Sequence, residues 1–108
     1  MATPDEMAEL IRLEMESAAH AKSDAERLDA LRKRIFSQLV VAHTADGTSV
    51  NKAEHMARAD ERYVQAEDNA LDAQTRANLS GAKAEGLRLK WETWRTRNAT
   101  KRAEMNLR

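Results

Sequence analysis

Residues 52–105 read KAEHMARADERYVQAEDNALDAQTRANLSGAKAEGLRLKWETWRTRNATKRAEM and contain small or apolar residues at alternating spacings of three and four. The series comprises Met56, Ala59, Tyr63, Ala66, Ala70, Ala73, Ala77, Ser80, Ala84, Leu87, Trp91 and Trp94, and Asn98 and Met105 continue it. This spacing is the heptad pattern of a helix that packs along one seam. It predicts one long helix over about residues 52–105.

The seam changes in character along this helix. Alanine lines most of it from Ala59 to Ala84, so that a partner helix can approach closely but buries little apolar area per turn. Larger residues follow, and the residues around them are basic. We expect the seam to mediate contacts between subunits at its larger side chains, which are Tyr63, Leu87, Trp91, Trp94 and Met105.

A second amphipathic helix is predicted over about residues 4–42. Thr3 is suited to be its N-cap, Pro4 its first residue, and Glu6 the partner of Thr3 in a capping box. Its heptad series comprises Met7, Ile11, Glu14, Ala18, Ala21, Ala25, Leu28, Arg32, Ile35, Leu39 and Ala42. Glu14 and Arg32 are charged, and two interpretations stay open: each reaches water from the edge of the stripe, or each makes a polar contact that sets the register between helices.

Residues 43–51 interrupt the periodicity and predict a turn. Asp46 and Gly47 are turn formers, and Asn51 is suited to be the N-cap of the next helix. A connection this short favours an antiparallel helical hairpin with a coiled-coil-like seam, in which Ala25 lies near Ala70. The second helix would then extend past the first from about Lys90 onward.

Such a hairpin buries too little apolar area to offset the entropy of ordering the chain. We therefore expect an obligate homo-oligomer, an all-α helical bundle in which residues 1–108 form one domain. The alternative is a break at Ser80 and Gly81 that folds the last segment back into a three-helix bundle. The unbroken spacing through Ala77, Ser80, Ala84 and Leu87 favours one continuous helix.

The charges are balanced overall but separated along the chain. The 18 basic residues equal the 18 acidic residues in number. Residues 1–31 contain eight acids and three bases, whereas residues 86–108 contain seven bases and two acids. With no cysteine, no apolar run long enough to span a membrane and an acidic N-terminus, the sequence predicts a cytoplasmic protein.

No pattern in the sequence predicts catalysis. His20, His43 and His55 lack metal-ligand spacing, although His43 and His55 could approach each other across the turn, and there is no glycine-rich phosphate loop. We expect neither an enzyme nor a bound metal or cofactor.

The C-terminal end of the second helix combines basic residues with two tryptophans. Cations that neutralise phosphates and aromatic faces that stack on bases are typical of proteins that bind single-stranded nucleic acid. The candidate residues are Arg88, Lys90, Trp91, Trp94, Arg95, Arg97, Lys101 and Arg102. The alternative is that the tryptophans belong to the helix seam and that the cations form a solvated face.

Residues 63–77 and 91–105 resemble small all-helical proteins of bacteriophage replication and recombination cassettes. More remotely, the hairpin layout is similar to UvsY-type recombination mediators. The resemblance implies a ring-like oligomer in the host cytoplasm that binds single-stranded DNA and helps to load a recombinase. Two other functions stay open: an interaction module that binds a host or phage protein, and a purely architectural coiled-coil component.

Overall fold

The computed structural model describes residues 3–107, which form three α-helices and no β-strand. The helices are α1 (Pro4–Ala45), α2 (Val50–Ala59) and α3 (Glu61–Asn106). The predicted all-α class is confirmed. Within residues 3–107, no helix is both long and apolar enough to cross a membrane.

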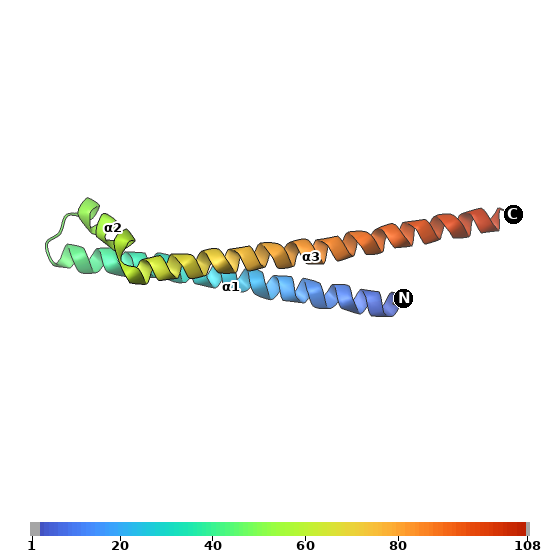
Figure 1. The fold of residues 1–108 in the computed structure, drawn as a ribbon, viewed down its shortest axis with the longest axis horizontal. Coiled ribbons are helices and arrows are strands. Elements are labelled where there is room, and N and C mark those ends of the chain that lie inside the picture. Colours follow the sequence, from blue (N-terminus) through green and yellow to red (C-terminus); the bar gives the residue numbers. More distant parts are fainter. Residues whose placement is uncertain (1–2, 108) are drawn as a thin grey trace.

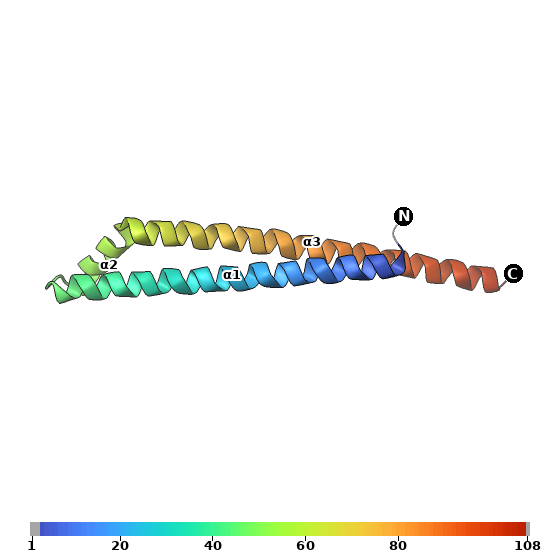
Figure 2. The same ribbon diagram turned by 90° about the horizontal axis from the view of Figure 1, so that it is seen from below.

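The molecule is a rod that measures 86 × 21 × 14 Å. Its radius of gyration is 23.8 Å, whereas a compact domain of this length has about 13 Å. Helices α1 and α3 lie side by side and run in opposite directions, and the end of α3 extends past the start of α1 (Figure 1). Seen from below, α2 packs at the opposite end of the rod, next to the end of α1 (Figure 2).

The start of α1 has the predicted capping box. The Thr3 hydroxyl accepts a hydrogen bond from the Glu6 amide at 3.2 Å, and the Glu6 carboxylate accepts one from the Thr3 amide at 3.3 Å. The helix ends three residues later than predicted, before a turn in which Gly47 has φ +88°. The N-cap of α2 is Ser49, so the assignment of this role to Asn51 was wrong.

The continuous helix predicted over residues 52–105 is broken at Asp60. Asp60 has extended backbone angles (φ −68°, ψ 134°), and its carboxylate accepts a hydrogen bond from the Arg62 amide at 2.9 Å. The break changes the helical phase. As a result, α2 buries Ala53 and Ala57 rather than the predicted Met56 and Ala59. An N-cap at Asp60 thus lets two helices of different phase pack against α1.

Past this break the predicted seam and the buried residues agree. Helix α3 runs through Ser80 and Gly81 without interruption, so the three-helix-bundle alternative does not occur. Its buried residues are Tyr63, Ala66, Ala70, Ala73, Ala77 and Ala84, all of them predicted seam positions. On α1, every predicted seam residue from Met7 to Leu39 is at least partly buried, whereas Ala42 is exposed.

The register between α1 and α3 differs from the prediction by about one helical turn. Ala25 packs against Ala73 and Ala77, further along α3 than the predicted Ala70. The break at Asp60 explains this shift, because α2 and its connections use residues that the prediction gave to a straight helix.

The two charged residues of the α1 seam contact α3. The Glu14 carboxylate forms an ion pair with Lys83 at 3.2 Å, and Arg32 donates a hydrogen bond to the Tyr63 hydroxyl at 3.2 Å. Arg32 also forms an ion pair with Asp29 at 2.8 Å. Of the two interpretations of these charges, the structure favours polar contacts between the helices.

Candidate nucleic-acid interface

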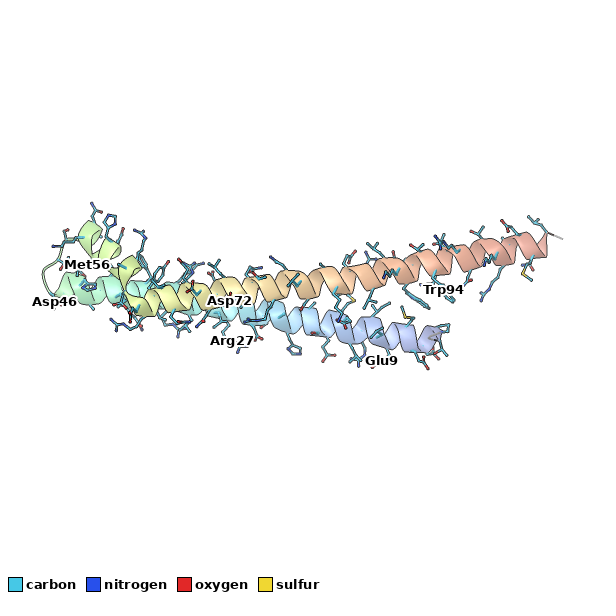
Figure 3. All side chains as sticks on the ribbon, viewed as in Figure 1. Glu9, Arg27, Asp46, Met56, Asp72 and Trp94 are labelled. Atoms are coloured by element: carbon cyan, nitrogen blue, oxygen red, sulfur yellow. The ribbon has the colours of Figure 1, made fainter. Side chains whose placement is uncertain are left out.

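The candidate interface lies on α3 where this helix reaches the start of α1. Heptad spacing places Trp91 and Trp94 on the side of α3 that carries the seam, and Figure 3 shows Trp94 near this end of the rod. The two indole rings stack, with their centroids 5.0 Å apart and their planes at 11°. Trp91 is half-buried and Trp94 is 41% exposed. Trp94 is thus partly accessible to solvent.

A groove of about 310 Å³ runs beside the stacked rings. It is lined by Pro4, Trp91, Trp94, Arg95, Asn98, Ala99 and Arg102. The prediction that α3 has no intramolecular neighbour from Lys90 onward was therefore wrong for the tryptophans, since Pro4 at the start of α1 lines the same groove. The shifted register explains the difference.

Five cations of this region are exposed and form no ion pair within the described residues 3–107. They are Lys90, Arg95, Arg97, Lys101 and Arg102. Interaction with the helix dipole does not explain them all, because this effect is confined to the last turn and the last turn of α3 has no basic residue. A phosphate could approach these five side chains without first displacing a carboxylate of this chain.

Arg88 differs from the other candidate cations. Its guanidinium forms ion pairs with Glu85 and with Glu92, one turn away on either side. These contacts lower the pKa of Glu85 and raise the pKa of Arg88. A phosphate at Arg88 would have to compete with two carboxylates, so we assign the main electrostatic role to the other five.

Two features of this region were not predicted from the sequence. The first is the stacking of the indole rings, although residues three apart on a helix are neighbours and their spacing permits it. The second is Pro4, whose position in the groove depends on the register between α1 and α3.

Outside the candidate interface, the described residues offer little support for a metal site or for a ligand site between α1 and α3. No group of three or more histidine, aspartate or glutamate side chains is placed to hold a metal ion in the described part of the chain. A groove of about 410 Å³ between α1 and α3 includes Asp29 and Arg32, and these two side chains already bind each other.

Comparison of the chain with protein-family models, with curated proteins and with solved structures gives no match. The resemblance to phage recombination proteins therefore stays a prediction, and functional inference depends on the geometry of the chain itself.

Proposed function

We propose that this chain is a non-enzymatic, self-associating helical protein that binds single-stranded DNA through the C-terminal end of α3. The observation that carries the proposal is a stacked tryptophan pair, with Trp94 partly exposed, in one groove with Arg95 and Arg102. In this proposal a base stacks on Trp94 while guanidinium groups bind the neighbouring phosphates. By resemblance, the cellular role would be assistance to recombination or replication, including the loading of a recombinase.

The cations of the site extend beyond the groove. Arg97 and Lys101 lie on neighbouring turns of α3, and Lys90 precedes the tryptophans. Residues 95–107 contain four bases and one acid, Glu104. Positive charge on several turns of a helix suits a phosphate backbone, whose binding releases counterions and does not depend on base sequence.

The weak packing of the chain supports self-association. Among residues 3–107 the buried hydrophobic residues are eight alanines, Leu39 and Tyr63, and several leucines are more than half exposed. The accessible surface is 8335 Å², compared with about 6,100 Å² for a compact protein of this mass. A chain with so much exposed surface gains stability by covering part of it in an assembly.

Titration with a single-stranded oligonucleotide tests the proposal, with tryptophan fluorescence as the signal. We expect quenching at low salt and an affinity that falls steeply as the salt concentration rises, because about 0.7 counterions are released for each phosphate contact. Anisotropy of a labelled oligonucleotide measures the same affinity without using the tryptophans.

Matched arginine variants locate the binding site. Arg95→Gln with Arg102→Gln should weaken binding and lower the salt dependence, whereas Arg76→Gln, an exposed site elsewhere on α3, should change neither. Equal effects of both changes would contradict the assigned site. If the anisotropy of the labelled oligonucleotide did not change at low or at high salt, DNA binding would be refuted and the protein-interaction or architectural function would be favoured.

A further inference from the structure

The face of α3 that points away from α1 contains a second series at helical spacing, which alternates between four and three from Thr75 onward. Starting at Leu71, positions spaced by three or four residues are all uncharged, although a third of the chain is charged. The first six are Leu71, Thr75, Leu79, Ala82, Gly86 and Leu89. Leu71, Leu79 and Leu89 are 60%, 67% and 51% exposed. We call this surface the outer face of α3; its positions alternate with the buried seam and lie opposite to it.

The outer face continues to the end of the helix. Its remaining positions are Thr93, Thr96, Thr100, Ala103 and Leu107, again without a charge. Three threonine hydroxyls of the face donate to the carbonyl four residues earlier: Thr75 to Leu71 at 3.1 Å, Thr93 to Leu89 at 2.9 Å and Thr100 to Thr96 at 3.0 Å. These hydroxyls are satisfied within the helix, so the three threonines behave as small and largely apolar residues.

Gly86 lies near the middle of the outer face, and no contact within the chain requires it. A Cβ atom built at this position has no atom within 4 Å to meet. Glycine lowers the stability of a helix interior, so its presence here is unexplained by the isolated chain. Glycine at a helix surface does permit the close approach of another helix.

We infer that the outer face of α3 binds the same face of a second copy of this chain, antiparallel and with the two-fold axis at Gly86. In this register, Leu71 lies level with Thr100 of the second copy, Leu79 with Thr93, and Leu89 with Ala82. Each leucine of these pairs meets a smaller residue, and the two glycines meet at the axis. A self-complementary surface of this kind is what a two-fold dimer requires.

The distribution of charge selects the antiparallel orientation. Residues 64–77 contain three acids and one base, and residues 94–107 contain four bases and one acid. The inferred register places these two segments level with each other, with Lys101 of one copy within a turn of Asp68 and Asp72 of the other. A parallel pair would instead align like charges along the same contact.

This inference specifies the self-association of the proposed function and does not depend on DNA binding. The groove of Trp91, Trp94, Arg95 and Arg102 belongs to the seam side of α3, so the assembly leaves it accessible. Lys101 is common to both proposals, and Arg95 and Arg102 therefore serve to test DNA binding separately. Binding of DNA and pairing of the outer faces can therefore fail independently of each other.

Disulfide formation tests the register directly, because the chain contains no cysteine. Gly86→Cys alone should form a covalent dimer on mild oxidation, since the axis brings the two positions together. Leu71→Cys alone should not, because the two copies of residue 71 lie about 45 Å apart in this register. A mixture of Leu71→Cys and Thr100→Cys chains should cross-link. Cross-linking of Leu71→Cys alone as readily as Gly86→Cys would overturn the inference.

Sedimentation measures the dimer dissociation constant independently, with variants that carry no introduced cysteine. Leu89→Lys should raise the dimer dissociation constant by at least about tenfold, because burial of a single leucine is worth about this much and the dimer loses two of them. Leu13→Lys, at an equally exposed leucine of α1 (49%), should leave it within a factor of about two, in line with other surface changes. Circular dichroism checks that both variants keep their helices. A wild-type chain that stays monomeric at micromolar concentrations, or equal effects of the two variants, would refute the dimer.

Arg95→Gln with Arg102→Gln should reduce DNA binding and leave the Gly86→Cys cross-link intact, which separates the two proposals.

Discussion

The polar contact between Arg32 and Tyr63 joins α1 to the first turn of α3. Tyr63 is 8% exposed, and its ring lies 5.5 Å from that of Phe36. The hydroxyl of a tyrosine this deeply buried needs a partner, and Arg32 supplies it at 3.2 Å. The Tyr63 hydroxyl also contributes to a raised pKa of Arg32, after the larger effect of the Asp29 carboxylate.

Removing this hydroxyl should destabilise the fold modestly. Tyr63→Phe is expected to lower the free energy of unfolding by about 1 kcal/mol, the net value of one such hydrogen bond. Urea denaturation followed by circular dichroism measures the change. In an Arg32→Met background the same substitution should have a smaller effect, and an equal effect in both backgrounds would contradict the contact.

Asp60 is the residue that ends α2 and begins α3, and its charge should make stability depend on pH. Hydrogen bonds from the Arg62 guanidinium and amide lower the pKa of Asp60 below its ordinary value of 3.8. The folded chain therefore binds this proton more weakly than the unfolded chain. The stabilisation is present above the unfolded pKa and is lost as the pH falls through the folded pKa.

We expect the thermal midpoint of the wild type to fall, relative to Asp60→Asn, as the pH is lowered below about 4. Asparagine keeps the N-cap acceptor without the charge, so the difference between the two chains isolates this carboxylate from the other acids. Thermal melts across this pH range provide the measurement. Parallel pH profiles would show that the ionised form of Asp60 contributes nothing.

At the scale of the elements, close packing of alanines determines how α1 and α3 meet. Ala25, Ala73 and Ala77 form one cluster, flanked by Ala21 and Leu28. Ala73 is only 2% exposed. Side chains this small allow the two helix backbones to approach closely, which leaves little room for a larger residue.

Enlarging a residue of this cluster should push the helices apart. Ala73→Leu is expected to cost about 1 to 3 kcal/mol through overpacking. Gln74→Leu, at the neighbouring exposed position, should change stability by less than about 0.5 kcal/mol. Chemical denaturation distinguishes the two, and a stabilising effect of Ala73→Leu would show that the helices are not closely packed there.

At the scale of the whole molecule, the inferred dimer has a characteristic length. The chain is 86 Å long, and Gly86 lies about 32 Å from Leu107 along α3. An antiparallel pair with its axis at Gly86 is therefore about 110 Å long. Two copies joined end to end through the tryptophan ends would be markedly longer.

At concentrations where the dimer forms, small-angle X-ray scattering should yield a maximum dimension of about 110 Å. The Leu89→Lys variant should return the dimension to that of the single rod. A particle much longer than about 110 Å would indicate contact through the ends of the rods, contrary to the outer-face dimer.

Much of the architecture could be predicted because it depends on local patterns. Heptad spacing identified the buried face of α3 from Tyr63 to Ala84 and nearly all of the α1 face, since burial on a helix follows its period. The capping box at Thr3 and Glu6 was equally local. The candidate cations and tryptophans were also identifiable, because they cluster in residues 88–102.

Features that depend on the relative position of α1 and α3 required the tertiary structure. The break at Asp60 resolves a conflict of phase between Ala53 and Ala57 on one side and Tyr63 on the other, which appears only when both helices pack on α1. That break shifts the register by a turn and brings Pro4 to the tryptophans. The sequence by itself thus determined the helices and their buried faces through periodicity, whereas the break at Asp60, the register and the groove were decided by packing between residues far apart in the chain.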